Sequence, residues 1–250
     1  MLSIRSAWTA SVLGLAAMGV VTAAVVQDSK FYGDISDLKL AKPEDKQDVA
    51  STPPPKDAII LFDGKNTDEW VTQDGKAPIP WLLKPNGVME VKGGGIKSKR
   101  LYDGHSLLHV EFRVPYMADQ TGQGRGNSGV YSQGRYEVQI LDSYGLDSQD
   151  NDCGGIYKVA KPLVNACKAP TVWQSYDIDF QAPQFKDGKK VKSARINVLQ
   201  NGIPIHKDIE IPLDNTVSGL GGDPSTPGPI HLQDHGNPVQ YRNIWMKKLD

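Results

Sequence analysis

Two carboxylates and an amide recur at short spacing in one part of the chain. Glu137, Gln139 and Asp142 follow the turn-forming pair Gly126 and Asn127, and apolar Tyr, Val and Ile alternate with the polar residues. Period-two alternation is typical of a β-strand with one buried and one polar face. Side chains fixed on one face of a strand suit a site that meets a polar ligand. A half-solvated surface strand would show the same alternation.

The second stretch with reactive side chains is HLQDHG, residues 231–236. Alternation places His231 and Gln233 on one face, and the turn at Gly236 could fold His235 back over it. Histidine is the side chain best suited to proton transfer near neutral pH. A histidine that only holds a turn by hydrogen bonds is the alternative interpretation.

Other predicted strands also carry polar side chains on one face. A merely solvated face would be rich in Lys, Ser and Thr, whereas these faces are rich in residues that bind sugars, transfer protons or hold ions. They are His109, Glu111, Arg113, Asp177, Asp179, Arg195, Asn197, Gln240 and Arg242. We expect part of this set, Glu111 and Arg242 included, to join the site, and Asp177, Asp179 and Arg195 to face solvent.

The strands must form two layers. About ten short alternating segments separated by turn residues, with no long helical stripe, predict two packed antiparallel sheets. The simplest arrangement is an all-β jelly-roll sandwich formed by residues 57–250 as a single domain.

The N-terminal part reads differently. Residues 1–26 combine Arg5 with a charge-free apolar stretch and small residues near Ala23, which predicts a signal peptide, with an uncleaved membrane anchor as the alternative. Residues 27–56 contain few large apolar residues and end in three prolines, so we expect a flexible linker. Export to the periplasm or the extracellular space follows as an expectation. The formal net charge of −1 gives no bias toward nucleic acid or acidic membranes.

The chain has two cysteines, Cys153 and Cys167, in one Gly- and Asn-rich stretch. In an oxidising compartment we expect a local disulfide, which contributes about 3 kcal/mol in the chain-entropy model. The absence of C-x-x-C spacing argues against a metal site.

The spacing of Glu137, Gln139 and Asp142 is similar to that of the E-x-D-x-x-E strand in laminarinase-like retaining β-glucanases, which also use a jelly roll. In those enzymes a bulge brings the outer carboxylates to the roughly 5 Å separation that double displacement requires. Here an amide replaces the central acid and the shorter Asp replaces the last Glu. Both changes weaken the prediction of ordinary retaining hydrolysis.

Six blocks in order resemble the 3-keto-disaccharide hydrolase domain family: LFDGKNTDEW, GNSGVY, YEVQILDSYG, CGGIY, WQSYDIDFQAP and IHLQDHGNPVQYRNIW. The resemblance spans essentially the whole predicted domain. It implies a concanavalin A-like lectin/glucanase fold and cleavage of glycosides already oxidised to a ketone at C3.

The implied reaction needs a base, an acid and stabilisation of an enediolate. A C3 ketone acidifies the C2 proton, so its removal lets the C1 substituent depart, and water then adds to the enone. We expect Glu137 or His235 as the base. Substrate or oxyanion binding is expected from Asn127, Gln139, Gln233 and Arg242, with His231 beside them, while Asp142 and Glu111 would tune these groups or hold a cation. A divalent cation would stabilise the enediolate, although no spacing is diagnostic and no cofactor is certain.

Two other functions fit the same pattern. One is a non-catalytic carbohydrate-binding domain, and the other is a laminarinase-like glycosidase acting on unoxidised glycan. The expected partner in every case is an oligosaccharide or a 3-keto-glycoside. The sequence does not indicate an oligomeric state.

Overall fold

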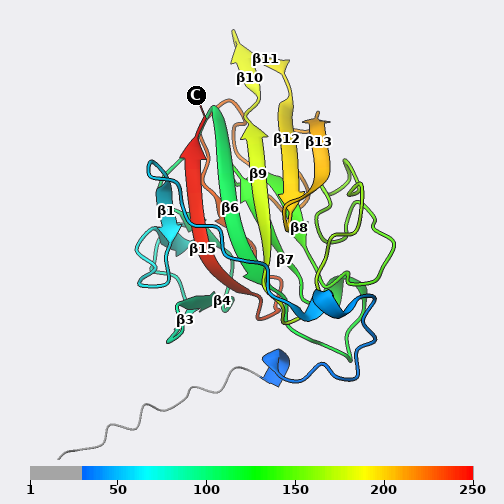
Figure 1. Cartoon of the computed structure of the whole chain (residues 1–250). Helices are drawn as coiled ribbons and strands as arrows, with labels where there is room; N and C mark the ends of the chain where they lie inside the picture. The colour runs from blue at the N-terminus through cyan, green and yellow to red at the C-terminus, as the bar shows by residue number, and fades with distance from the viewer. Residues whose placement is uncertain (1–29, 250) are drawn as a thin grey trace, which may run out of the picture.

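The computed structural model describes residues 30–249, and Figure 1 shows two antiparallel β-sheets packed face to face. Sheet A has the spatial order β13 (Ile203–Ile211), β12 (Ala194–Gln200), β9 (Gln174–Gln181), β6 (His105–Arg113), β15 (Gln240–Lys248), β4 (Val88–Glu90) and β3 (Leu82–Lys84), and β1 (Ile59–Phe62) also pairs with β15. Sheet B has the order β2 (Trp70–Thr72), β5 (Ile96–Ser98), β14 (His231–Leu232), β7 (Ser128–Ser132) and β8 (Tyr136–Ile140). The predicted all-β, two-sheet sandwich is confirmed.

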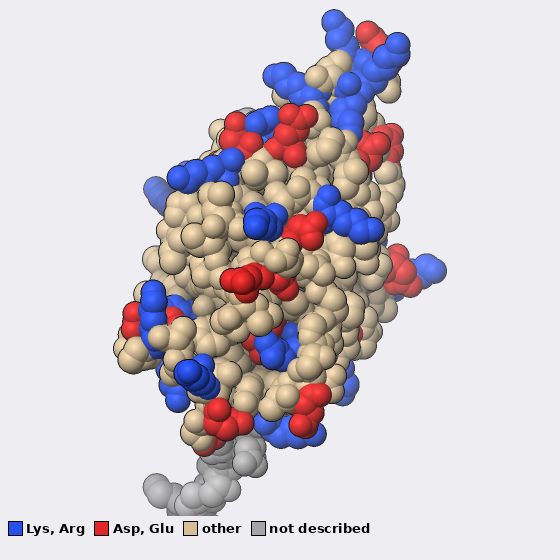
Figure 2. Space-filling view, turned by 90° about the vertical axis from the view of Figure 1, so that its right-hand side faces the viewer, with Lys and Arg blue, Asp and Glu red and all other residues tan. Residues whose placement is uncertain are grey.

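The remaining elements are short. The strands β10 (Gln184–Lys186) and β11 (Lys189–Lys192) form a separate hairpin that projects beyond the sandwich. Figure 2 shows basic side chains gathered on this hairpin. Three 3-10 helices complete the described part: η1 (Lys30–Tyr32), η2 (Pro43–Lys46) and η3 (Gly122–Gly124).

Alternate residues of each strand fill the space between the sheets. Tyr136, Val138 and Ile140 of β8 are fully buried there, and the ring of Tyr136 lies 5.2 Å from that of Phe180 in sheet A, centroid to centroid. Because successive side chains of a strand point to opposite faces, Glu137 and Gln139 must lie on the outer face of sheet B. The packing of three apolar side chains thus determines which way the two polar ones point.

The described part of the expected linker, from residue 30 to residue 56, is not a free tether. It crosses the outer face of sheet A, passing over β6 and β15 (Figure 1). The backbone N–H of Val49 donates to the carbonyl of Trp173 at 3.0 Å, and the Tyr32 hydroxyl donates to the carbonyl of Pro238 at 2.7 Å. Specific polar anchors, which low apolar content does not exclude, hold this N-terminal segment on the domain.

Two further predictions concern the cysteines and the N-terminus. Cys153 and Cys167 are free, buried thiols, so the predicted disulfide is not formed in the structure. Gln200 Nε2 lies 3.6 Å from each sulfur, and the Tyr176 hydroxyl lies 3.1 Å from Cys153 Sγ, so polar side chains contact the thiols instead. The predicted signal peptide, residues 1–26, lies outside the described residues. Within residues 30–249, no helix is long and apolar enough to span a membrane.

Candidate functional site

The strand register brings three reactive side chains into one row on the outer face of sheet B. His231 of β14 pairs with Tyr131 of β7, and Tyr131 pairs with Glu137 of β8. In the neighbouring row Gly129 pairs with Gln139, and the backbone N–H of Gln233 donates to the carbonyl of Gly129 at 3.0 Å. Residues from widely separated parts of the chain therefore meet on one face.

Glu137 is the most perturbed acid of this face. Its side chain is buried, and burial raises the pKa of its carboxyl to about 8, although a hydrogen bond with Tyr131 acts in the opposite direction. A Cβ atom on Gly129 would overlap Glu137 Oε1, so the carboxyl lies directly over this glycine. The missing side chain at position 129 creates the space that the acid occupies. A carboxyl with a pKa near neutrality is suited to proton transfer.

Tyr131 and Gln233 lie beside this carboxyl. The Gln233 Nε2 donates to the Tyr131 hydroxyl at 3.1 Å, and the same hydroxyl hydrogen-bonds Glu137. Burial raises the pKa of Tyr131 far above its ordinary value, so the phenol keeps its proton and remains a donor. The sequence analysis did not single out Tyr131. In GNSGVY, Tyr131 alternates with Gly129, which indicates that both lie on the same face of the strand. Only the register of β7 against β8 places Tyr131 next to Glu137.

His231 is held in one tautomer. Its Nδ1 lies 2.8 Å from the carbonyl oxygen of Ile96, which can only accept, so Nδ1 carries the proton. Burial lowers the pKa of His231 to about 4, so the ring is neutral near pH 7 and Nε2 is its acceptor nitrogen. The imidazole lies 4.9 Å from the Tyr131 ring, centroid to centroid. His231 is therefore suited to accept a hydrogen bond from a ligand.

An amide cluster adjoins the row of Glu137. The Oε1 atom of Gln123, in η3, accepts hydrogen bonds from Asn127 Nδ2 at 3.0 Å and from Gln139 Nε2 at 3.1 Å. The structure thus brings Asn127 and Gln139 together, as expected for polar residues of one face. Gln123 is a member that the sequence analysis missed, because it lies in a loop without periodicity.

Asp142 does not form a carboxylate pair with Glu137. Strand β8 ends at Ile140, and the backbone N–H of Ser143 donates to the carbonyl of Leu141 at 3.0 Å, so Asp142 lies in a turn beyond the strand that carries Glu137. Arg125 Nε lies 3.1 Å from Asp142 Oδ2. Burial raises the pKa of Asp142, while the Arg125 charge lowers it. Neither acid shifts the pKa of the other, so the two do not form the close pair, roughly 5 Å apart, that a retaining glycosidase uses.

His235 lies in the exposed turn that follows β14. Asp234 holds this turn, because its two carboxylate oxygens accept from the backbone N–H of Gly236 at 2.6 Å and of Gly94 at 2.7 Å. The turn does not fold His235 into the buried row of Glu137. Its role as a base has no support from the geometry.

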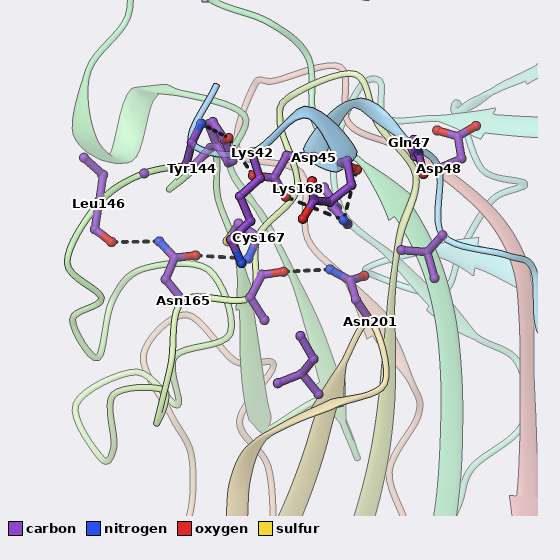
Figure 3. A pocket seen from close by; sticks show the side chains of 16 residues that line it. Lys42, Asp45, Gln47, Asp48, Tyr144, Leu146, Asn165, Cys167, Lys168 and Asn201 are labelled. Carbon is purple, nitrogen blue, oxygen red and sulfur yellow. Dashed lines mark hydrogen bonds and ion pairs between the residues drawn. The ribbon is translucent and has the colours of Figure 1, made fainter. Parts of the chain in front are cut away.

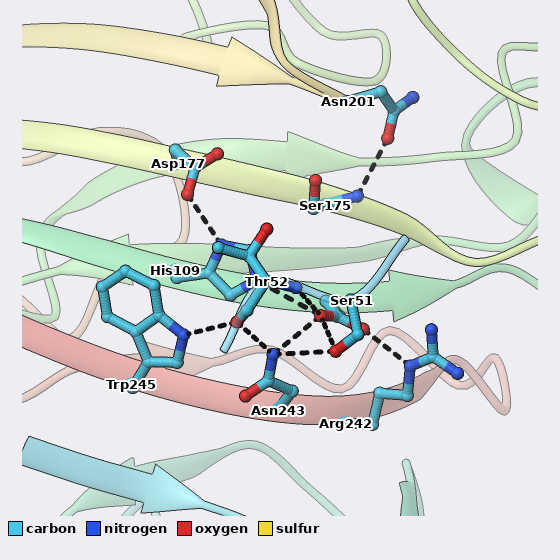
Figure 4. A network of polar contacts seen from close by, with 10 residues as sticks. Ser51, Thr52, His109, Ser175, Asp177, Asn201, Arg242, Asn243 and Trp245 are labelled. Atoms are coloured by element: carbon cyan, nitrogen blue, oxygen red, sulfur yellow. Dashed lines mark hydrogen bonds and ion pairs between the residues drawn. The ribbon is translucent and has the colours of Figure 1, made fainter. Parts of the chain in front are cut away.

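Glu111 pairs with Arg242 in the register of β6 and β15, so both lie on the outer face of sheet A and not on sheet B. Figure 4 shows Arg242 close to Ser51 and Thr52 of the N-terminal segment. Arg242 Nε donates to Glu111 Oε2 at 2.6 Å, and Glu111 Oε1 accepts from Ser51 Oγ at 2.5 Å and from the backbone N–H of Thr52 at 3.1 Å. The two residues therefore bind the N-terminal segment and do not face Glu137.

The charges of this second network reinforce one another. Burial alone would raise the pKa of Glu111, but hydrogen bonds from His109, Ser51, Asn243 and Arg242 lower it to about 2. Burial also acts to lower the pKa of His109, yet its contacts with Asp177 at 2.7 Å and with Glu111 raise it overall. The network is a set of mutually satisfied hydrogen bonds and ion pairs that binds the N-terminal segment to sheet A.

A groove of about 590 Å³ lies between the N-terminal segment and the loops that follow β8 and β12 (Figure 3). Two of its charged groups pair with each other, since Lys168 Nζ lies 3.6 Å from Asp45 Oδ1, and the Tyr144 hydroxyl donates to Asp45 Oδ2 at 2.7 Å. None of the residues of the Glu137 row line it. We therefore place the candidate site at Glu137, where the perturbed acid is, and not in this larger groove.

The expected divalent cation finds no site of the usual kind. Within residues 30–249, no group of three or more His, Cys, Asp or Glu side chains is placed to hold a metal ion. The row of Glu137 offers one carboxyl, one imidazole and several amides, which is a donor set for hydroxyl groups.

Comparison with known proteins gives the family of this two-sheet sandwich. The family described as a 3-keto-alpha-glucoside-1,2-lyase-like domain matches residues 57–247, and this chain belongs to it. The resemblance noted in the sequence is thereby confirmed. The family implies a glycosidase-like, carbohydrate-active function.

Solved structures agree with this assignment. A crystal structure from Parabacteroides distasonis ATCC 8503, named a "putative glycosyl hydrolase", is 34% identical with a TM-score of 0.67, and the match covers 83% of this chain and 97% of that one. A second structure of the same name and organism is 21% identical with a TM-score of 0.55, covers 78% of this chain and 95% of its own, and shows the fold alone. No curated protein matches the chain.

Proposed function

We propose that this protein cleaves 3-keto-glucosides by 1,2-elimination, with Glu137 as the base that removes the C2 proton. The observation that carries the proposal is the pKa of about 8 for a carboxyl buried on the outer face of sheet B. A carboxylate with such a pKa is a much stronger base than an ordinary glutamate, as abstraction of a proton next to a ketone requires. The family match supports the substrate class.

The electron and proton balance of the reaction is simple. Glu137 takes the C2 proton, and the C2–H electron pair forms an enolate with the C3 oxygen. The enolate then collapses to a C1–C2 double bond while the bond from C1 to the aglycone oxygen breaks. That oxygen takes up the proton that Glu137 removed from C2, which returns Glu137 to its ionised form, and addition of water across the C1–C2 double bond of the enone restores a 3-keto sugar.

The neighbours of Glu137 have matching roles. The protonated Tyr131 hydroxyl and the Gln233 amide are donors that can stabilise the charge developing on the C3 oxygen. Neutral His231 can accept a hydrogen bond from a sugar hydroxyl through Nε2. These groups lie in one row and its neighbour on the same face of sheet B.

The competing functions have less support. Retaining hydrolysis needs a second carboxylate near Glu137, whereas Asp142 lies in the turn beyond β8 and neither acid shifts the pKa of the other. Ionisation of a buried carboxyl destabilises the fold, and a binding domain without catalytic activity does not need a carboxyl with a raised pKa.

The direct test compares a disaccharide with its 3-keto form. We expect monosaccharide release only from the 3-keto form, and a loss of at least about 100-fold in kcat/KM for Glu137→Gln. Glu210→Gln, an exposed acid of β13, is the matched control and should keep full activity. Release from the plain disaccharide, or full activity of the Glu137 variant, would refute the proposal.

We also propose that the protein is exported, because residues 1–26 have the pattern of a signal peptide. Fractionation of cells that express the full chain tests this, together with N-terminal sequencing of the product. A full-length protein in the cytoplasmic fraction would contradict it.

A further inference from the structure

Two buried acceptor atoms beside Glu137 lack a partner in the described part of the chain. They are Asn127 Oδ1 and Gln139 Oε1, in side chains that are 1% and 2% exposed. An unsatisfied buried polar atom costs about 1–3 kcal/mol, and such atoms are rare in folded proteins. Two of them in adjacent side chains point to a missing donor.

The orientation of both amides is determined by backbone carbonyls, which can only accept. Asn127 Nδ2 donates to the carbonyl of Gln123 at 2.8 Å, and Gln139 Nε2 faces the carbonyl of Asn151 at 3.4 Å. Gln123 Nε2 donates to the same Asn151 carbonyl at 2.9 Å, which turns Gln123 Oε1 toward the other two amides. Rotating Asn127 or Gln139 by 180° would set oxygen against oxygen, so the unpaired atoms are acceptors.

The acceptors lie where a ligand of Glu137 would extend. Gln139 is two residues along β8 from Glu137 on the same face, about 7 Å away. Both amide nitrogens bond to the one Gln123 Oε1 atom, so the two amides are neighbours and one small ligand can reach both. Gln123 is half-buried, and glycines at positions 122, 124 and 126 give its loop the freedom to admit a ligand.

We propose that Asn127 Oδ1 and Gln139 Oε1 form a subsite that accepts the hydroxyl hydrogens at C4 and C6 of the bound glucosyl unit, and that Gln123 positions both amides. The sugar identity rests on the proposed function. With C2 at Glu137, the C4 and C6 hydroxyls are at the far end of the ring, whereas the C3 ketone has no hydrogen to donate. Neutral amides accept these hydroxyls without adding a negative charge that would shift the pKa of Glu137 further.

A metal cation is the alternative ligand that two amide oxygens could bind. The nearest acid on the strand, Glu137, is mostly protonated at neutral pH because of its raised pKa, and Asp142 is paired with Arg125. Two neutral oxygens without an ionised carboxylate make a poor site for a divalent ion. The hydroxyl assignment is therefore the better fit.

The test measures binding, not turnover, by calorimetry with methyl α-glucoside and its 2-deoxy, 4-deoxy and 6-deoxy analogues. For the wild-type protein we expect the 4-deoxy and 6-deoxy analogues to bind about tenfold more weakly than the parent. The variant Gln139→Met is similar in shape but lacks the acceptor, so it should bind the parent and the 2-deoxy analogue more weakly than the wild-type protein does. Its affinity for the analogue that lacks the partner hydroxyl of Gln139 should equal that of the wild-type protein. Gln123→Leu, which removes the acceptor that holds both amide nitrogens, should mimic this loss.

Several results would overturn the assignment. These are equal binding of all analogues by the wild-type protein, absence of binding of every sugar, or binding of the parent that depends on added Ca²⁺. The wild-type scan needs no variant, so poor folding of Gln139→Met would not hide the answer. The proposed function and the subsite can be tested separately. If 3-keto sugars are not turned over but the 4-deoxy and 6-deoxy analogues bind more weakly as expected, only the elimination chemistry is rejected.

Discussion

Glu137 is a carboxyl whose chemistry follows from its burial. The side chain lies among Tyr131, Gly129 and the backbone of a covering loop, where the Glu137 N–H donates to Thr216 Oγ1 at 3.0 Å. Burial disfavours the ionised form and raises the pKa to about 8. A base must be ionised to accept a proton, so the ionised fraction limits the rate below that pH.

The pH dependence of the reaction follows from this pKa. We expect kcat/KM for a 3-keto-glucoside to rise about tenfold per pH unit below pH 8 and to level off above it. Measuring the profile from pH 5 to pH 9.5 tests this. A rate that instead falls through pH 8 would show that Glu137 works as an acid.

Gly129 is predicted to be required for this acid. In Gly129→Ala the new Cβ would overlap Glu137 Oε1 and lie 2.9 Å from the Tyr131 ring, so the carboxyl must move. We expect a 10- to 100-fold loss in kcat/KM and about 1–3 kcal/mol of destabilisation from overpacking. Gly33→Ala, where the new Cβ would lie 3.9 Å from its nearest neighbour, the Lys30 carbonyl oxygen, is the control for thermal melting. Unchanged kcat/KM in the position 129 variant would contradict the placement of Glu137.

At the scale of elements, alternation predicted the strands and the faces but not the sheet to which each strand belongs. Glu137 and Glu111 both alternate with apolar residues, yet β8 belongs to sheet B and β6 to sheet A. Sheet membership depends on pairings between distant parts of the chain, which a local period cannot report. For this reason the sequence analysis placed Glu137, Gln139 and His231 correctly on polar strand faces and grouped Glu111 and Arg242 wrongly with them.

The same limit applies to the N-terminal segment. Its composition predicted a linker, because few apolar residues are available for burial, but its anchors are polar. Ser51, Thr52 and Asn243 all bond to Glu111 Oε1, and the indole N–H of Trp245 donates to the carbonyl of Thr52 at 3.1 Å. Composition counts apolar area and does not detect a few well-placed hydrogen bonds to a buried charge.

Loss of the Glu111 charge should therefore loosen the N-terminal segment. In Glu111→Gln the ion pairs with Arg242 and His109 disappear, so we expect trypsin to cleave the segment at Lys46 or Lys56 about tenfold faster under native conditions. Glu210→Gln removes an exposed charge of sheet A and should leave this rate unchanged. Equal cleavage of Glu111→Gln and wild-type protein would show that the other contacts of the segment suffice.

For the whole molecule, two buried acids on opposite outer faces shape the pH dependence of stability. Glu137 has a pKa of about 8 in the folded protein, above its ordinary value of 4.5. Its contribution to the unfolding free energy is therefore fully present below pH 4.5 and is lost as the pH rises to 8. Glu111 has a folded pKa of about 2, so its contribution is present above pH 4.5 and is lost as the pH falls to 2. We call these two pH-dependent changes in the unfolding free energy the alkaline limb (Glu137) and the acidic limb (Glu111). At 1.36 kcal/mol per pKa unit, they amount to up to about 5 and about 3 kcal/mol.

Because the sandwich core separates the two acids, the limbs should be removable one at a time. We expect Glu137→Gln to flatten the decline of the unfolding free energy between pH 5 and 8, and Glu111→Gln to flatten its rise between pH 2 and 4.5. The double variant should show both changes, with values that add within about 0.5 kcal/mol because the sites share no partner. Urea unfolding of the four proteins across this pH range measures the limbs. A change of the alkaline limb in Glu137→Gln that depends on the residue at position 111 would mean that the two faces are coupled through the core.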